Sequence, residues 1–163
     1  ESDMDGMSES ISNGLEVIQE NGKTRIKVNA KNSEVSYVID GIEYVADSLK
    51  NGIPDEIATV NMITSPTNAK KSYVIINTKQ KKGQFISYAN GVLKYKYDKQ
   101  EYTLNPEKLE EPALLINNRL TRQFNIDPLQ IIQIRPASEL ERQLFSAPSA
   151  QVIIVTDKMG FFF

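Results

Sequence analysis

The chain contains 163 residues, of which 40% are hydrophobic and 25% are charged, and its formal net charge at pH 7 is -2. This composition is typical of a globular protein with a core of its own, and the charge alone does not indicate nucleic acid or a membrane surface as the partner. The chain has no Cys, His or Trp, which excludes thiol nucleophiles, thiolate and histidine metal sites and His-dependent catalytic triads within it. Because its apolar runs are no longer than a strand, we expect no membrane-spanning helix, which needs about 20 residues.

Residues 1–13 are acidic and rich in serine. A segment with so little apolar surface to bury predicts a flexible leader, similar to the tether of an exported protein. The chain begins at Glu1 and not at Met. We therefore expect a mature or trimmed fragment from which any targeting segment has been removed.

An internal repeat begins after this leader. Residues 14–28 align without a gap with residues 83–97 at an offset of 69, and both segments contain a glycine, an Asn-Gly pair and a basic–apolar–Lys–apolar tetrad. Asn-Gly between alternating residues is a strong hairpin signal, because a type I′ turn needs positive φ at both central positions. The predicted hairpins join 15–19 to 24–29 and 84–88 to 92–97.

Three further blocks repeat in the same order. At offsets of 77, 74 and 78 they pair 37–41 with 114–118, 54–60 with 128–134 and 74–78 with 152–156. Changes in the lengths of the connecting segments account for the different offsets. Four blocks in one order indicate a tandem duplication, with repeat 1 at 14–82 and repeat 2 at 83–163.

After its hairpin each repeat is predicted to form a short strand, at 35–39 or 113–117. This strand ends at Asp40-Gly41 in one repeat and at Asn117-Asn118 in the other. All four residues belong to types that tolerate left-handed backbone geometry, so we expect a turn at this point.

Two more strands are predicted to complete each repeat. Pro54 and Pro128 each precede a short turn that leads into a strand, at 57–63 or 130–135. The last strand, 73–78 or 151–156, is almost wholly apolar, which is typical of a central strand covered on both faces.

A helical pattern separates these two strands in repeat 2. Residues 137–145 place Leu140, Leu144 and Phe145 on one face and offer Ser138 as an N-cap. Repeat 1 is four residues shorter over this interval and contains Pro66, so we expect one helical turn or none there. The predicted fold class is α+β, as two tandem sheet-dominated repeats that are mostly β with one or two short helices.

The blocks Tyr37–Gly41, Ile53–Asn61 and Tyr73–Lys79 resemble the plug domain of TonB-dependent outer-membrane receptors. More narrowly, they resemble the plug-like repeats found in exported regions of some membrane metallopeptidase sensor proteins. The segment Leu114–Lys158 fits the family spacing, including its helix, although the Gly-rich element before the last strand is absent from both repeats. The resemblance implies a periplasmic or outer-membrane-associated module for interaction or sensing. It implies no catalytic residue and no cofactor, with another cell-envelope protein or a second copy as partner.

Lysine is concentrated between Lys70 and Lys99, where eight lysines accompany one acidic residue and aromatic residues lie between them. One interpretation is a surface that binds a polyanion. The interpretation we favour is that the lysines line the solvent faces of strands while the aromatic rings pack inward, so we expect no nucleic acid partner. The candidate interaction residues are Lys79, Lys81, Lys82, Lys94, Lys96, Phe161, Phe162 and Phe163.

Other polar groups give weaker signals. The acidic pairs Asp55-Glu56 and Glu110-Glu111 lack the further ligands of a calcium loop, and Ser146 and Ser149 lack a base, so we expect no metal site and no catalytic site. The three phenylalanines at 161–163 are expected to dock on the core or on a partner. The hypothesis that follows is a non-enzymatic exported binding or sensing module. The alternative is a structural or assembly module of a cell-envelope complex.

Overall fold

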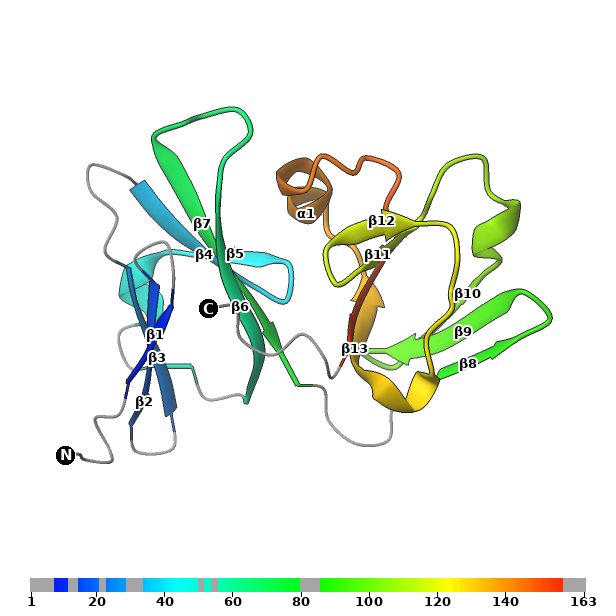
Figure 1. The fold of residues 1–163 in the computed structure, drawn as a ribbon, viewed down its shortest axis with the longest axis horizontal. Helices are drawn as coiled ribbons and strands as arrows, with labels where there is room; N and C mark the ends of the chain where they lie inside the picture. Colours follow the sequence, from blue (N-terminus) through cyan, green and yellow to red (C-terminus); the bar gives the residue numbers. More distant parts are fainter. Residues whose placement is uncertain are drawn as a thin grey trace. The chain divides into compact units, whose positions relative to one another are not determined.

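The computed structural model describes residues 8–11, 15–20, 23–28, 34–49, 52–53, 56–79 and 86–156. The chain divides into two units between Lys79 and Gln80, close to the predicted repeat boundary at 82/83, and each unit is described by itself below (Figure 1). Strands dominate the described residues, which contain one short α-helix. The structure therefore confirms the expectation of a mostly β protein of the α+β class.

The first unit contains two sheets. An antiparallel meander has the order β1-β2-β3, with bounds Ser8–Ile11, Leu15–Glu20 and Lys23–Val28. A mixed sheet has the order β5-β4-β7-β6, formed by β4 (Glu34–Ile39), β5 (Ile42–Tyr44), β6 (Ile57–Thr64) and β7 (Lys71–Thr78). A 3-10 helix, η2 (Ala46–Leu49), follows β5.

The second unit also contains a meander and a mixed sheet. The meander has the order β10-β9-β8, from β8 (Ile86–Ala89), β9 (Val92–Tyr97) and β10 (Gln100–Leu104). The mixed sheet has the order β12-β11-β14-β13, from β11 (Leu114–Ile116), β12 (Arg119–Thr121), β13 (Ile131–Pro136) and β14 (Val152–Thr156). The helices are η3 (Pro106–Lys108), η4 (Pro128–Gln130) and α1 (Glu139–Leu144).

The two mixed sheets have the same strand order, the same strand directions and the same register. The central pairs β4/β7 and β11/β14 are parallel, and the outer strands are antiparallel to them. Tyr37 lies opposite Val74, as Leu114 lies opposite Val152. A register shift between residues 57 and 59 of β6 is matched by one between residues 131 and 133 of β13. The blocks aligned at offsets of 77, 74 and 78 therefore occupy equivalent places in the two sheets.

A polar clamp closes the carboxyl end of each central pair. Asp40 and Asn117 have φ of 50° and 51°, and each begins the turn after its strand. The Asp40 carboxylate accepts hydrogen bonds from the Thr78 backbone N–H at 2.9 Å and from the Thr78 hydroxyl at 2.5 Å. In the second unit the Asn117 side chain accepts from the Thr156 N–H at 3.1 Å and donates to the Thr156 hydroxyl at 2.9 Å. The predicted left-handed turns are thus confirmed, and their side chains also fix the end of the last strand.

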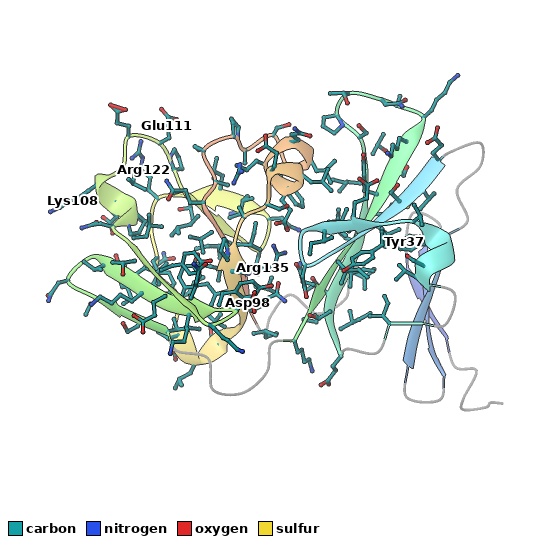
Figure 2. All side chains as sticks on the ribbon, turned by 180° about the vertical axis from the view of Figure 1, so that it is seen from behind. Tyr37, Asp98, Lys108, Glu111, Arg122 and Arg135 are labelled. Carbon is teal, nitrogen blue, oxygen red and sulfur yellow. The ribbon has the colours of Figure 1, made fainter. Side chains whose placement is uncertain are left out.

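Each unit has its own apolar core. In the first, one packed cluster of buried residues consists of Tyr37 (labelled in Figure 2), Ile53, Ile57, Val60, Val74 and Ile76. In the second, the cluster comes from the meander and from the mixed sheet and consists of Leu93, Tyr95, Leu114, Phe124, Ile134, Val152 and Ile154. β14 is buried at every position and β7 at all but its first, so the prediction of central last strands is confirmed.

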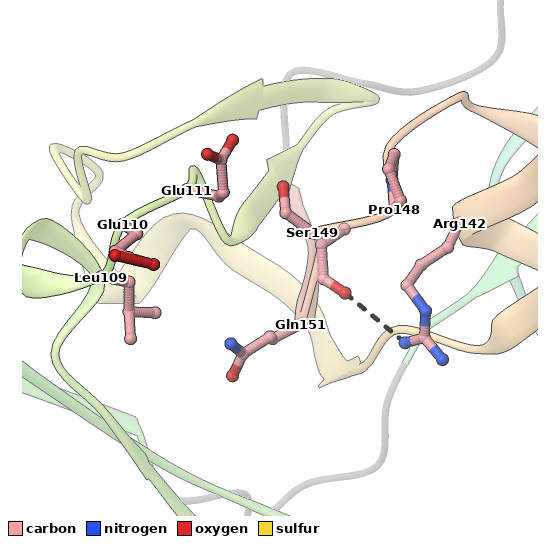
Figure 3. A pocket seen from close by; sticks show the side chains of 8 residues that line it. Leu109, Glu110, Glu111, Arg142, Pro148, Ser149 and Gln151 are labelled. Atoms are coloured by element: carbon pink, nitrogen blue, oxygen red, sulfur yellow. Dashed lines mark hydrogen bonds between the residues drawn. The ribbon is translucent and has the colours of Figure 1, made fainter.

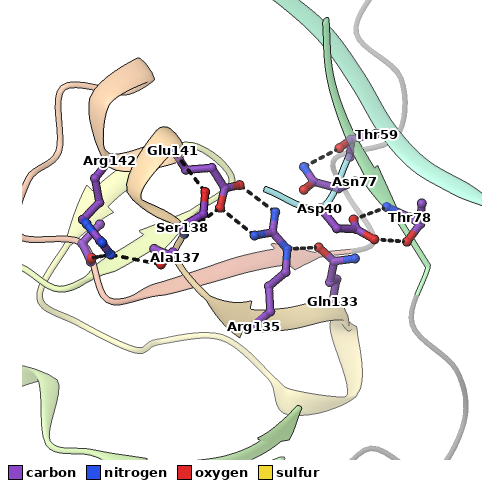
Figure 4. A network of polar contacts seen from close by, with 11 residues as sticks. Asp40, Thr59, Asn77, Thr78, Gln133, Arg135, Ala137, Ser138, Glu141 and Arg142 are labelled. Atoms are coloured by element: carbon purple, nitrogen blue, oxygen red, sulfur yellow. Dashed lines mark hydrogen bonds and ion pairs between the residues drawn. The ribbon is translucent and has the colours of Figure 1, made fainter. Parts of the chain in front are cut away.

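Helix α1 is joined to β13 by a buried ion pair (Figure 4). The Arg135 guanidinium donates to both Glu141 carboxylate oxygens, at 2.6 and 2.7 Å, and its Nε donates to Gln133 Oε1 at 2.7 Å. Arg135 and Glu141 are each only 1% exposed. Glu141 also accepts from the Ser138 N–H, and the Ser138 hydroxyl accepts from the Glu141 N–H, which completes a capping box. The predicted N-cap at Ser138 is confirmed, and the helix is held at its first turn by charge as well as by its apolar face.

Some elements differ from the predictions. Residues 8–11, expected to belong to a flexible leader, form β1 and pair with β2; backbone hydrogen bonding at a sheet edge does not require apolar side chains. β5, β10 and β12 were not predicted. Each is a short strand joined to its partner by a two-residue turn, and the β9–β10 turn uses Asp98 and Lys99 at φ of 49° and 68° without any glycine. The meanders also differ, because β1 is added to the first hairpin strand and β10 to the second.

Other expectations about local structure are confirmed or fall outside the described residues. The Asn90-Gly91 turn has φ of 55° and 80°, as a type I′ hairpin requires. Residues 65–70 of the first unit form no helix, as expected from Pro66. The Asn21-Gly22 turn and Pro54 lie outside the described residues.

Removal of the Glu141 carboxylate is expected to destabilise the second unit strongly. Glu141→Ala leaves the buried Arg135 guanidinium without its counter-charge, which costs about 3–5 kcal/mol. The matched control is Glu56→Ala, which removes the exposed Lys79–Glu56 ion pair of 3.0 Å and should cost about 0–1 kcal/mol. Urea unfolding followed by circular dichroism measures both. Equal effects of the two substitutions would show that the buried pair contributes no more than the exposed one.

The clamp makes a second prediction, at Asn117. Asn117→Ala removes two hydrogen bonds and places alanine at positive φ, so the free energy of unfolding should fall by about 2–4 kcal/mol. Asn117→Asp should cost less than about 1 kcal/mol, because a carboxylate can still accept from the N–H and the hydroxyl of Thr156, as Asp40 does from Thr78. Thermal unfolding of the two variants tests this, and an unfolding temperature for Asn117→Ala at or above that of Asn117→Asp would contradict it.

Candidate functional site

Two adjoining cavities lie in the second unit, on the side where β14 begins. The tyrosine cavity, of about 290 Å³, is lined by β9, β10 and the ends of β13 and β14. The glutamate cavity, of about 390 Å³, lies between the segment Leu109–Glu111 and the segment Pro148–Gln151. Arg142 and Gln151 line both cavities, so the two adjoin across a shared wall and are described together as the candidate site.

The tyrosine cavity lies beside β10. Successive side chains of a strand point to opposite faces, so Tyr102 and Leu104 face the core while Thr103 faces the other way. All three line the cavity, so it follows β10 over three consecutive residues. The strand β9 occupies one edge of β10, and the other edge is unpaired among the described residues.

Two stacked rings form the aromatic part of this cavity. The rings of Tyr95 and Tyr102 lie 5.0 Å apart between centroids at an interplanar angle of 14°. Burial raises the pKa of the Tyr95 phenol above its ordinary value of 10.0, and the neighbouring Tyr102 raises it further. The Tyr102 hydroxyl donates to Gln100 Oε1 at 2.9 Å. The Tyr95 phenol is therefore neutral at physiological pH, and the two stacked rings offer an apolar, polarisable wall.

Figure 3 shows the side chains that line the glutamate cavity. Hydrogen bonds to backbone carbonyls fix its walls. The Arg122 guanidinium donates to the carbonyl oxygens of Leu109 and Glu110. The Ser149 hydroxyl donates to the carbonyl of Pro112 at 2.6 Å and so joins the two walls. The backbone of this loop is held in place, while the side chains of Glu110 and Glu111 remain exposed. Figure 2 shows Arg122 and Glu111 at this end of the second unit.

The charge of Arg142, on the shared wall, is already balanced. Its Nη1 donates to the carbonyls of Ala137 at 3.0 Å and Ala150 at 3.5 Å, and its Nη2 lies 3.4 Å from Glu139 Oε1. The remaining charges that line the glutamate cavity are the carboxylates of Glu110 and Glu111. The candidate site thus combines an aromatic cavity with an adjoining cavity that is lined by two carboxylates and by Arg142, which is paired with Glu139.

The predicted interaction residues lie elsewhere or outside the described residues. Lys79 is exposed and forms an ion pair with Glu56 at 3.0 Å. Lys94 and Lys96 are exposed on the outer face of β9, and Lys96 lies 4.0 Å from Glu101. Tyr73 and Tyr95 are buried, and Tyr88 and Tyr97 pack against the core of the second unit. Lys81, Lys82, Phe85 and Phe161–Phe163 lie outside the described residues.

Sequence reasoning missed the cavity residues Tyr102, Arg142 and Gln151. The alternation in Gln100–Leu104 is a strand signal that would have placed Tyr102 beside Tyr95, but no sequence pattern relates Arg142 to residues 109–111. Glu110 and Glu111 are exposed, as expected for solvated charges, but they share a cavity. Glu56 is also exposed, and Asp55 lies outside the described residues.

The described residues contain no group of three or more His, Cys, Asp or Glu side chains that could hold a metal ion. Within the same residues, no helix has the length and apolar character needed to cross a membrane. Comparison with family models, curated proteins and solved structures finds no match to this chain.

The lysine-rich region is expected not to bind polyanions. Lys79 and Lys96 have acidic neighbours, and interspersed acids weaken the counterion release on which polyanion binding depends. The protein should therefore pass through a heparin column at physiological salt. As a matched control, the variant Glu56→Lys with Glu101→Lys should be retained. Salt-dependent retention of the unmodified protein that Lys94→Gln with Lys96→Gln abolishes would contradict this prediction.

Proposed function

We propose that this chain is a non-enzymatic binding or sensing module of the cell envelope, built from two plug-like repeats and located in the periplasm or at the outer membrane. The observation that carries the proposal is the common register of the two mixed sheets, together with the shared clamp of Asp40 with Thr78 and Asn117 with Thr156. These are the segments whose residues resemble the plug family. The resemblance supports export and interaction with another envelope protein.

The chemistry of the candidate site favours recognition over catalysis. Arg142 is committed to two carbonyls and to Glu139. Glu110 and Glu111 line a cavity but are exposed to solvent. Arg135 and Glu141 form a strong pair, but both are buried and hold the helix to the sheet. Stacked tyrosines beside a charged rim are typical of a surface that binds another molecule.

An assembly module is the alternative, and exposed apolar residues in the first unit favour it. Ile42 and Tyr44 of the edge strand β5 and the following Val45 are 60%, 36% and 66% exposed. Exposed apolar side chains can pack against those of a second copy. In that case the mass of the protein should rise with concentration and fall again in Ile42→Ser with Val45→Ser, as analytical ultracentrifugation would show.

Capture from cell-envelope extracts tests the main proposal. The immobilised protein should retain one partner saturably at both low and high salt, because a contact centred on an aromatic cavity is weakly screened. Glu110→Lys with Glu111→Lys should reduce this capture, while Lys94→Gln with Lys96→Gln, on the outer face of β9, should leave it unchanged. Circular dichroism checks that both variants fold. Failure of the unmodified protein to retain any partner saturably would overturn the binding function.

A further inference from the structure

We propose that the outer edge of β10 binds an extended peptide of the partner as an added strand, with one apolar side chain in the tyrosine cavity and a Lys or Arg side chain against Glu110 and Glu111. This inference rests on the proposed binding function and names the chemical class of its partner. It is carried by three features of the second unit: the strand edge, the cavity beside it and the charge of the adjoining cavity.

The register of the β9–β10 hairpin directs peptide groups outward. Tyr97 and Gln100 flank a two-residue turn, and Tyr102 lies opposite Tyr95. In such a hairpin the two residues that flank the turn exchange a pair of backbone hydrogen bonds. Every second cross-strand pair farther from the turn does the same. The N–H and C=O groups of Glu101 and Thr103 therefore point away from β9. Within the described residues, no hydrogen bond to these four backbone groups is seen.

The other edges of the second unit are less suited to strand addition. β12 has three residues, and β13 carries a register shift and ends in Pro136. Short edges, bulges and prolines are the devices that prevent pairing with another chain. The edge strand β8 contacts η4. β10 has five residues with an unbroken register and a cavity lined by its last three residues.

The cavity beside β10 fits one apolar side chain of an added strand. Alternate side chains of such a strand lie on the same face as Tyr102 and Leu104. There they meet the stacked tyrosine rings, which gain from apolar contact, and the apolar side chains of Pro136 and Val152 at the far wall. The volume of about 290 Å³ accommodates a leucine or phenylalanine side chain.

Charge selects the neighbouring residue of the peptide. Arg142 and Gln151 line both cavities, so an added strand that continues past Arg142 would reach the glutamate cavity. There, Glu110 and Glu111 are the carboxylates without an ion pair among the described residues. Arg142 is already paired with Glu139. An acidic side chain of the peptide would therefore find no unpaired cation on the wall that Arg142 forms. A lysine or arginine of the peptide complements these carboxylates, and an acidic peptide is repelled.

Fluorescence polarisation with labelled eight-residue peptides tests the inference on the whole chain. The probes are threonine-rich peptides that carry one leucine or phenylalanine and a lysine two or four residues to either side. At least one should bind saturably. Its lysine-to-glutamate version should bind at least about tenfold more weakly, a difference that corresponds to the loss of one favourable charge contact. Methylation of the peptide backbone nitrogens should abolish binding, because it removes the donors that an added strand needs.

Thr103→Pro and Thr103→Val form a matched pair of variants. Proline removes an outward N–H and places its ring on the strand edge, but it leaves the hydrogen bonds with β9 intact. Thr103→Pro should weaken peptide binding about tenfold or more, which is the expected loss of at least one strand hydrogen bond and its geometry. Thr103→Val keeps the N–H and the β-branched shape of threonine, so it should bind the peptide clearly more tightly than Thr103→Pro does. Thermal unfolding confirms that both variants fold.

Reversal of charge provides an independent measurement. Glu110→Lys with Glu111→Lys should exchange the preference, so that the lysine peptide binds weakly and the glutamate peptide binds better. The inference is overturned if no peptide binds, or if Thr103→Pro binds as Thr103→Val does. It is also overturned if Thr103→Pro lowers the mass of a self-associating protein while peptides fail to bind, because the occupant is then a second copy.

The experiment separates this inference from the proposed function. If the unmodified protein and Thr103→Pro capture the same envelope partner equally well, the binding function stands and strand addition to β10 is wrong. If neither captures a partner and no peptide binds, both proposals fail together.

Discussion

Both mixed sheets depend on a parallel central pair, and parallel strands cannot be joined by a tight hairpin. Two other strands of the same sheet separate β4 from β7 along the chain, and two separate β11 from β14. The clamp between the residue after the first strand and the threonine of the last one fixes the register where they finally meet. Because Asp and Asn both tolerate left-handed backbone, one side chain makes the turn and also holds the strand. The carboxyl ends of the sheets are thus the same in both units.

The opposite ends of the sheets are where the units diverge. In the second unit, α1 is inserted between β13 and β14, and the buried Arg135–Glu141 pair holds it to β13. At the register positions of Arg135 and Gln133, the first unit has Asn61 and Thr59. The Thr59 hydroxyl oxygen accepts a hydrogen bond from the Asn77 side chain at 3.0 Å. Without an Arg–Glu pair there is no charged anchor for a helix. α1 in turn supplies Arg142, which lines both cavities, so the candidate site is a consequence of this insertion.

The sequence predicts the repeated scaffold well but not the candidate site. Asn-Gly turns, apolar last strands and the Ser138 cap are local signals, and each led to an element at the expected place. β10 was missed because its turn is Asp98-Lys99, which carries no glycine, although both residues have positive φ. The cavities were missed for a different reason. Arg142, Tyr102 and Glu111 come from separate segments, and only the packing of the meander on the mixed sheet brings them to one side of the unit.

An open strand edge is a liability unless something uses it. The mixed sheet of the second unit protects its edges, with three residues in β12 and a bulge and a proline in β13. β10 has five residues, an unbroken register and no proline. The turn at Asp98 and Lys99 does not require a strand of this length. Its unprotected edge lies beside a tyrosine stack and two carboxylates. The mixed sheet is thus protected at its edges, while β10 is open beside a cavity. This is the pattern expected when β10 has a partner, because an open edge without a partner would favour aggregation.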